Sequence, residues 1–270
     1  MPELPEVETI RRSLLARVVG TSITGVLVRE RRLRKPIAAD FETRLSRRRI
    51  ERIDRRGKYL LLALDDGHIL LVHLGMSGSL TIAPSEAQLE PHDHVRLHLD
   101  SGASLTFNDP RRFGLMELGR LDALRELGNV GVDPLAIEWS AEEWRAATRG
   151  RRLPIKNLLM DQRVLAGIGN IYANETLFRA GIRPRRRADR LRRQEIERLA
   201  RAVREILERA VRLGGSSISD FRDGEGRPGY FQMHHAVYDR AGSPCVRCGA
   251  TIRRVVLSGR SSFYCPECQK

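Results

Sequence analysis

The stretch YLLLALDDGHILLVH, residues 59–73, holds two apolar runs of strand length on either side of Asp65-Asp66-Gly67. Two such runs around a short turn that contains Gly predict a β-hairpin. Further along, residues 95–99 alternate between apolar and polar, and a second turn follows at 100–102. Several short strands at this spacing are typical of a β-sandwich. We therefore expect the region from about 22 to 118 to be mainly β.

Helical patterns lie on both sides of this β region. Apolar residues recur with helical spacing over 6–19, which predicts a helix at the start of the first domain. In a second region, which begins near Pro134, Ser140 and Glu143 fit a capping box. Residues 196–210 predict a long amphipathic helix that ends at Gly214-Gly215.

All four cysteines lie in the last 26 residues, as two Cys-x2-Cys pairs separated by 16 residues. Two pairs at this spacing can close a tetrahedral zinc site with four thiolates, and such a site has no open position for water. We therefore expect one structural zinc ion, which stabilises a segment too short for a core of its own. Reactive thiols or two disulfides are the alternatives. The predicted ligands are Cys245, Cys248, Cys265 and Cys268.

Together these patterns predict an α+β protein of several domains. The first is a β-sandwich with a leading helix, over 1–132. The second is helical, over 133–230, and contains a loop at 216–230 that is rich in Gly, Ser and Asp. The third is the four-cysteine finger, over 236–270.

The composition indicates a polyanionic partner without proving one. The formal net charge is +14, from 48 Lys and Arg against 34 Asp and Glu. Such a surplus attracts nucleic acid, although a solvated basic surface gives the same number. Four of the basic residues are Lys, and a Lys can relay a proton where an Arg cannot. We see neither a signal peptide nor an apolar run of membrane-spanning length, and we expect a cytoplasmic protein.

The N-terminal sequence Met-Pro-Glu-Leu-Pro-Glu contains a candidate amine nucleophile. Removal of Met1 would leave Pro2 as a secondary amine, and an α-amino group has a pKa of about 8, well below that of Lys. An amine of this kind can attack a sugar C1′, and the iminium that forms favours β-elimination. Glu3 and Glu6 can then supply or accept protons. Acidic residues at the start of a helix are also explained by the helix dipole alone.

Two further features indicate contacts with phosphate. The turn Gly167-Ile168-Gly169-Asn170 opens a predicted helix, and backbone N–H groups at such a start bind anions. Arg151 and Lys156 add positive charge nearby, although an ordinary turn between helices also fits. In the finger, Arg260 follows a Ser-Gly turn at the tip of a predicted hairpin, where it can grip a phosphate or remain solvated.

The whole chain resembles the formamidopyrimidine-DNA glycosylases. The resemblance rests on motifs that follow one another in the family's order and on the terminal four-cysteine finger. These motifs are residues 1–8 (MPELPEVE), 57–59 (GKY), 73–78 (HLGMSG), 109–114 (DPRRFG), 159–161 (LMD), 167–172 (GIGNIY) and 228–230 (PGY).

This resemblance implies a β-sandwich catalytic domain, a helix–two-turn–helix domain and a zinc finger, which hold double-stranded DNA between them. It implies removal of 8-oxoguanine and formamidopyrimidines from DNA, followed by β,δ-elimination at the abasic site. It also implies that the enzyme is a monomer. Pro2 falls on the Schiff-base nucleophile and Glu3 on the general acid. Lys58 falls on the lysine of β-elimination, and Arg260 on the finger arginine of phosphate binding and δ-elimination.

The resemblance also implies how DNA is held. Glycosylases of this kind turn the damaged nucleotide out of the duplex, and side chains fill the gap. Here those side chains are Met76, Arg111 and Phe113, with Arg111 opposite the orphan cytosine. Loop 216–230 falls on the segment that closes over the extruded base. Contacts with the DNA backbone are expected from His73, His92, Arg151, Lys156 and Asn170.

Two rival interpretations stay open at this point. Endonuclease VIII, the sister branch, prefers oxidised pyrimidines, but its members commonly start Pro-Glu-Gly-Pro-Glu where this chain has Leu4. A zinc-ribbon protein that binds DNA without catalysis would explain the charge and the finger. It would leave the N-terminal amine, Glu3 and Lys58 without a role.

Overall fold

The structure is a computed structural model that describes residues 1–217 and 221–270. It contains two compact units. The first comprises Met1–Gly128 and Leu213–Tyr230, and the second comprises Asn129–Arg212 and Phe231–Lys270. The sequence-based division kept 133–230 in one domain, whereas in the structure the segment Leu213–Tyr230 belongs to the first unit.

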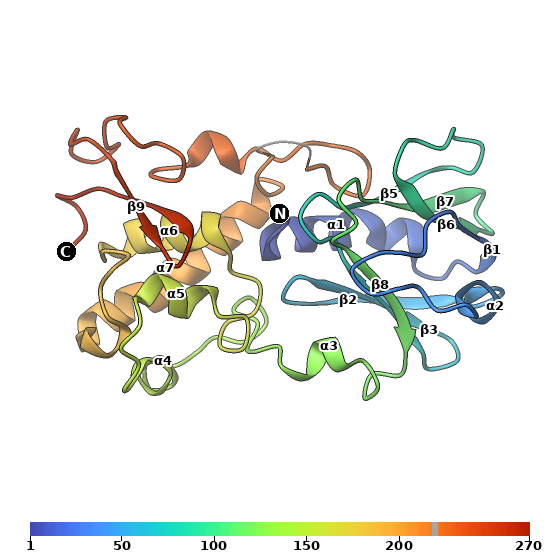
Figure 1. Cartoon of the computed structure of the whole chain (residues 1–270), viewed down its shortest axis with the longest axis horizontal. Coiled ribbons are helices and arrows are strands. Elements are labelled where there is room, and N and C mark those ends of the chain that lie inside the picture. Colours follow the sequence, from blue (N-terminus) through green and yellow to red (C-terminus); the bar gives the residue numbers. More distant parts are fainter. Residues whose placement is uncertain (218–220) are drawn as a thin grey trace. The chain divides into compact units, whose positions relative to one another are not determined.

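Two four-stranded antiparallel sheets make up most of the first unit (Figure 1). One has the strand order β1-β6-β7-β5 and the other has the order β2-β3-β4-β8. The strands are β1 Ile23–Val28, β2 Ile50–Arg56, β3 Tyr59–Leu64, β4 Ile69–His73, β5 Ser79–Pro84, β6 Asp93–Leu99, β7 Ala103–Asn108 and β8 Leu115–Gly119.

The hairpin predicted from residues 59–73 is formed by β3 and β4, with Leu61 opposite Leu71. Leu60, Leu62 and Leu64 are buried in one hydrophobic cluster, to which both sheets contribute. Because successive side chains of a strand point to opposite faces, each sheet turns one apolar face into this cluster. This arrangement confirms the expected β-sandwich.

The helices of the first unit are α1 Leu4–Val18, α2 Phe41–Leu45 and α3 Arg125–Gly128. Helix α1 begins two residues before the predicted start, because Pro5 is tolerated in a first helical turn that needs no N–H donor. Its apolar stripe of Val7, Ile10, Leu14 and Val18 is buried in the core of the sandwich.

The segment Leu213–Tyr230 joins the first unit through hydrogen bonds to α1 and β5. The Ser216 N–H donates to Glu6 Oε1 at 2.8 Å, and the Gly224 N–H donates to Ser13 Oγ at 2.9 Å. The Ile82 N–H donates to the Gly224 carbonyl at 2.7 Å. Residues 218–220, which lie inside the predicted loop 216–230, are outside the described residues.

The second unit is helical and ends in a small two-stranded sheet. The Ser140–Glu143 capping box is present at the start of its first helix, as predicted. No helix in residues 1–217 and 221–270 has both the length and the apolar character that a membrane span requires. The elements of this unit are α4 Ala141–Thr148, α5 Ile155–Met160, α6 Asn170–Ala180, η1 Ala188–Arg190, α7 Arg193–Arg212, η2 Phe231–His234, β9 Arg253–Leu257 and β10 Arg260–Tyr264.

Candidate active site and nucleic-acid interface

The amino terminus lies among charged side chains of the first unit. Pro2, Glu3 and Glu6 are buried, and Glu6 Oε2 accepts a 2.8 Å hydrogen bond from the Glu3 N–H. Burial lowers the pKa of the amino-terminal amine of Met1 below 8.0. The carboxyl groups of Glu3 and Glu6 oppose this shift, whereas the positive charges of Lys58 and Arg111 add to it. A lowered pKa leaves more of the Met1 amine unprotonated near neutral pH, and the same charges surround the position that Pro2 would hold as the first residue.

Lys58 reaches this region from the turn between β2 and β3. Gly57 has φ +58°, a left-handed conformation that favours Gly, and Lys58 itself is buried. The turn is tied to α1 through Arg55, which donates to the Gly57 carbonyl at 3.1 Å and to Glu8 Oε2 at 3.0 Å. Lys58 is therefore held by a turn that is fixed to the helix carrying the amine.

Glu8 is the centre of this connection. Its carboxylate also accepts hydrogen bonds from Arg11, at 2.9 and 3.0 Å, and from Arg12, at 2.7 Å. These arginines and Arg55 hold the pKa of Glu8 at about 2, against the burial that raises it. Sequence reasoning gave Glu8 and Arg55 no role, since charged residues on a helix and a strand usually face solvent.

Met76, Arg111 and Phe113, the predicted gap-filling side chains, lie on two loops of the first unit. Met76 and Phe113 are 43% and 46% exposed, which is unusual for large apolar side chains. The Arg111 guanidinium carbon lies 4.8 Å from the centre of the Phe113 ring. At Gly75, where φ is +60°, a Cβ atom would come within 2.5 Å of the backbone at 113–114. Only Gly allows the two loops to approach so closely.

Asp109 holds these two loops together. Its buried carboxylate accepts hydrogen bonds from Ser77 Oγ at 3.0 Å, from the Arg111 N–H at 3.3 Å and from the Gly114 N–H at 2.7 Å. Sequence reasoning placed Asp109 in a family motif without assigning it a function. A short acidic side chain just before a Pro turn is the signal that could have indicated this role.

The two histidines of the predicted interface differ in exposure. Burial, with smaller contributions from Arg34 and Lys58, lowers the pKa of His73 to about 3. Because the Gly75 N–H donates to His73 Nδ1 at 3.0 Å, the neutral ring carries its proton on Nε2. His73 is thus a neutral donor near neutral pH. His92 is exposed, has φ +69°, and accepts a hydrogen bond from the Asp109 N–H through its carbonyl.

In the second unit, Lys156 connects α5 to the finger. Its side chain is 1% exposed, and Nζ donates to the Ser261 carbonyl at 2.8 Å and to Ser262 Oγ at 2.7 Å. Asn157 Nδ2 donates to Ser258 Oγ at 2.6 Å. These bonds fix the hairpin tip, where Arg260 begins β10 and is exposed. Contact between Lys156 and DNA stays a prediction.

The remaining predicted phosphate ligands of this unit are Arg151, which is half-buried after α4, and Asn170, which begins α6. Gly167, with φ +95°, turns the chain before α6, and its N–H donates to Gln162 Oε1 at 2.8 Å. A helix N-terminus carries a partial positive charge that favours an anion. Whether Arg151 and Asn170 contact phosphate stays a prediction.

Two further residues of α6 fix the finger, and sequence reasoning missed both. Asn174 Oδ1 accepts a 2.8 Å hydrogen bond from the Phe263 N–H. The Glu175 carboxylate accepts from the backbone N–H groups of residues 236–238, and burial raises its pKa. Adjacent polar residues within a helix that is otherwise buried are a signal for such contacts.

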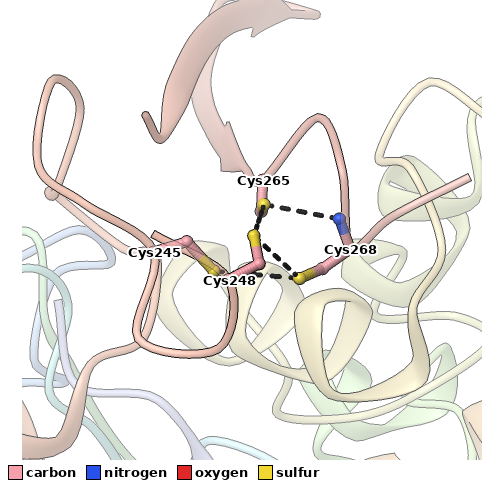
Figure 2. Close-up of side chains that lie close together, drawn as sticks. All are labelled: Cys245, Cys248, Cys265 and Cys268. Carbon is pink, nitrogen blue, oxygen red and sulfur yellow. Dashed lines mark hydrogen bonds between the residues drawn. The ribbon is translucent and has the colours of Figure 1, made fainter. Parts of the chain in front are cut away.

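The four cysteines form a cluster in the finger (Figure 2). All four Sγ atoms lie within 4.8 Å of one another, with separations of 3.9 Å for Cys245–Cys268, 3.5 Å for Cys248–Cys265 and 3.4 Å for Cys248–Cys268. Zn–S bonds of about 2.3 Å in a tetrahedron place the sulfurs roughly 3.8 Å apart. The donor set and its spacing therefore fit a structural metal ion, and these distances exclude disulfides in this arrangement.

A sandwich with a buried Pro2 and Glu3 at its amino-terminal end, a helical unit and a four-cysteine finger define a DNA glycosylase with a zinc finger, and three family models agree. The formamidopyrimidine-DNA glycosylase N-terminal domain matches residues 1–116, the H2TH domain of the same enzymes matches 130–222, and the zinc finger found in FPG and IleRS matches 242–270. The chain belongs to the formamidopyrimidine-DNA glycosylase family.

Individual relatives match over the full length of the chain. It is 47% identical to the formamidopyrimidine-DNA glycosylase of Syntrophotalea carbinolica, with 100% of both sequences covered. Among solved structures, the MutM (FPG) protein of Thermus thermophilus is 42% identical, with a TM-score of 0.88 and 99% and 98% of the two chains covered. The FPG mutant G226P of Lactococcus lactis, in complex with DNA containing Fapy-dG, is 34% identical, with a TM-score of 0.92 and full coverage of both chains.

Proposed function

We propose that this chain removes oxidised purines, 8-oxoguanine and formamidopyrimidines, from double-stranded DNA and then cleaves the abasic site by β,δ-elimination. The observation that carries the proposal is the buried Pro2, which follows an amino-terminal amine whose pKa is lowered among Glu3, Glu6, Lys58 and Arg111. The mature nucleophile would be Pro2 after removal of Met1. A Lactococcus lactis relative was solved with DNA containing Fapy-dG, and another with DNA containing an abasic site.

The proposed reaction begins with attack of the Pro2 nitrogen on C1′. The bond from C1′ to the base breaks and the sugar ring opens, so the base and the ring oxygen each take up a proton; Glu3 donates one of these protons and the Pro2 N–H supplies the other. Opening of the ring leaves an iminium between Pro2 and C1′. Loss of a C2′ proton then sends electrons towards the iminium, and the 3′-phosphate leaves. Lys58 assists this step, and water finally hydrolyses the Schiff base.

DNA binding supports this chemistry, because C1′ is inaccessible inside a duplex. Arg111 and Phe113 stack on each other, and with Met76 they fill the gap left by the extruded nucleotide. Neutral His73 donates through Nε2, while the charged groups of Arg151 and Arg260 neutralise phosphates. Lys156 is buried, so it supports phosphate binding by holding the hairpin that carries Arg260 and by its positive charge. Arg260 also assists δ-elimination at the second phosphate. His92 and Asn170 complete the contacts with the DNA backbone. The protein is proposed to act as a monomer at the nucleoid.

The segment 216–230 is proposed to cover the extruded base. In its described part, Ser216 is bonded to Glu6, and Gly215 leaves little room for a side chain. A Cβ atom on Gly215 would lie 2.9 Å from Glu6 Oε1. The same carboxylate that bonds the Glu3 backbone therefore also bonds this segment, so the loop and the nucleophile share one anchor.

The metal of the finger is proposed to be one zinc ion, held by the thiolates of Cys245, Cys248, Cys265 and Cys268. Zinc would supply folding free energy here, because four thiolates leave no position for a reacting water. Within the finger, the residue proposed to contact DNA is Arg260.

Borohydride trapping tests the proposed activity. The mature protein is incubated with a duplex that contains one 8-oxoguanine opposite cytosine, reduced, and mapped by peptide mass spectrometry. We expect a covalent adduct on Pro2. An adduct formed instead with an oxidised pyrimidine would indicate endonuclease VIII activity. Tight binding without any adduct, despite a free Pro2, would mean that the chain binds DNA without this catalysis.

A further inference from the structure

A groove of about 870 Å³ lies in the second unit, between α6, α7, η2 and the residues that follow Cys245. Its apolar lining comes from Phe178, Ile206 and Phe231 on these elements. Met233 and Val246 also line it, and they are 78% and 63% exposed. The volume falls within the roughly 300–1,000 Å³ of pockets that enclose a ligand. Apolar side chains this exposed mark a site of interaction.

The charges around the groove are mostly positive. Arg179 and Arg212 are paired with Glu205 and Glu208, at 2.7 Å and 4.0 Å. Arg209 and Arg247 also line the groove and are exposed, and within the described part of the chain neither lies within ion-pair distance of a carboxylate.

The positions of these two arginines are fixed by a histidine, a phenylalanine ring and a backbone carbonyl. A terminal nitrogen of Arg209 lies 3.0 Å from His234 Nδ1. The guanidinium carbon of Arg247 lies 4.4 Å from the centre of the Phe178 ring, and its terminal nitrogen donates to the Phe178 carbonyl at 3.4 Å. Each guanidinium therefore lies beside an apolar surface with no carboxylate of the described residues in ion-pair distance, which favours a partner that supplies one.

The chemistry of the lining distinguishes this groove from a phosphate track. None of the second unit's proposed phosphate ligands (Arg151, Lys156, Asn170 and Arg260) is among the residues that line it. Glu205 and Glu208 lie between the arginines of the groove, so the groove offers separate positive points and no continuous positive track for a row of phosphates. An apolar floor flanked by separate arginines instead suits a chain that carries both apolar side chains and carboxylates.

We propose that this groove binds a short acidic segment of another protein. One apolar side chain of that segment packs against Phe178, Ile206 and Met233, and its carboxylates pair with Arg209 and Arg247. The groove thereby recruits a partner protein to the repair enzyme. The proposal does not depend on the proposed chemistry at Pro2.

Peptide selection followed by measurement of affinity tests this docking site. The intact, zinc-loaded protein is used to select from a displayed library of random nine-residue peptides. The recovered peptides are then labelled, and their affinity is measured by fluorescence anisotropy. We expect peptides that combine net negative charge with at least one large apolar residue. Met233→Ser and Arg209→Gln should each weaken peptide binding at least tenfold, because the first removes an apolar contact and the second an ion pair. Both side chains are exposed, so their loss leaves the fold intact.

Two matched variants control for these changes. Arg201→Gln removes another exposed arginine of α7, and Ile137→Ser removes another exposed apolar side chain of the same unit. Neither lines the groove, and neither should change peptide affinity. All four variants should be trapped on an abasic duplex at the wild-type rate. The trapping assay therefore tests the proposed chemistry at Pro2 independently of the peptide affinity that tests the groove.

Three outcomes would overturn the proposal. The first is recovery of no peptide above a protein-free surface. The second is recovery of peptides whose affinity Met233→Ser and Arg209→Gln leave unchanged. The third is that a short single-stranded oligonucleotide binds, that no peptide does, and that Met233→Ser and Arg209→Gln abolish binding of the oligonucleotide. The last result would make the groove a nucleic-acid site.

Discussion

The amine at the amino terminus is controlled by four charged side chains that differ in sign. Glu3 and Glu6 stabilise its protonated form, whereas Lys58 and Arg111 destabilise it, as does burial. The net result is a pKa below 8.0. These shifts are those of the Met1 amine. Once Met1 is removed, we expect the same side chains to act on the neighbouring nitrogen of Pro2 and to set the fraction of enzyme that can attack C1′ at a given pH.

Lys58→Gln should therefore raise the pKa of the amine, since it removes a positive neighbour. The pH profile of Schiff-base formation, measured as the initial rate of borohydride trapping on an abasic duplex, should move to higher pH. At pH 7 the variant should form the Schiff base more slowly than the wild type, and above both midpoints the two rates of Schiff-base formation should converge. Lys35→Gln is the matched control, because Lys35 is exposed and forms an ion pair with Glu117. An unchanged midpoint in Lys58→Gln would contradict this electrostatic account.

The sequence predicts some residues of the site better than others. Pro2, Glu3 and Lys58 were found because their chemistry is distinctive and their motifs match a family. Asp109, Glu8 and their partners were not, because their role lies in hydrogen bonds to backbone and side chains far along the chain. Arg55 reaches Glu8 across 47 residues. No local pattern distinguishes such a buried ion pair from two solvated charges.

Among elements, α1 and the β2–β3 hairpin form one functional support. Helix α1 carries the amine, and the hairpin turn carries Lys58. Arg55 joins them by donating to Glu8 on one side and to the Gly57 carbonyl on the other. A change at Glu8 is thus expected to alter both stability and the position of Lys58.

Glu8→Gln should lower the free energy of unfolding by about 2–4 kcal/mol at pH 7, because it removes the buried negative charge that accepts hydrogen bonds from Arg11, Arg12 and Arg55. The folded-state pKa of Glu8 is about 2, below its ordinary value of 4.5. The stabilisation is therefore fully present above pH 4.5 and is lost as the pH falls through about 2. The difference from the wild type in urea denaturation should be constant from pH 7 to 5 and should narrow below 4.5. Glu51→Gln, at an exposed position on β2, should change little.

The finger is the element that depends most on its metal. Its own hydrophobic cluster is small, and it is held to α5 and α6 by Lys156, Asn157 and Asn174. Chelation should release one zinc ion per chain, measured by mass spectrometry of the metal, and should speed hydrogen exchange in β9 and β10. Exchange in β3 and β4 should stay slow, as they belong to the other unit. Slow exchange in the metal-free finger would show that its fold does not require the ion.

At the scale of the whole molecule, the sequence predicts elements better than it predicts their grouping. The hairpin of 59–73, the Ser140 capping box and the four-cysteine cluster follow from residues close in sequence. The return of Leu213–Tyr230 to the first unit does not, because its bonds to Glu6 and Ser13 span more than 200 residues. The composition of 216–230 indicates a loop, but it says nothing of the helix to which that loop is bound.

The net charge of +14 is also a property of the whole molecule, and two accounts of it differ in their consequences. If the charge acts as a diffuse field, removal of any exposed arginine should weaken DNA binding similarly. If a few cations lie at the phosphates, only those release counterions, and each contributes a slope of about −0.9 in a plot of log affinity against log salt concentration.

We expect the second behaviour. Arg151→Gln should reduce the magnitude of the slope by about 0.9 and weaken binding to damaged and undamaged duplexes by the same factor. Arg201→Gln, which removes an exposed arginine of α7, should leave the slope unchanged. Phe113→Ala should also keep the slope but should lower affinity for the lesion duplex alone, because its ring fills the gap in the stack and carries no charge. Anisotropy titrations between about 50 and 200 mM salt measure the slope for all three variants. If Arg151→Gln and Arg201→Gln reduced the magnitude of the slope equally, the result would favour the diffuse field.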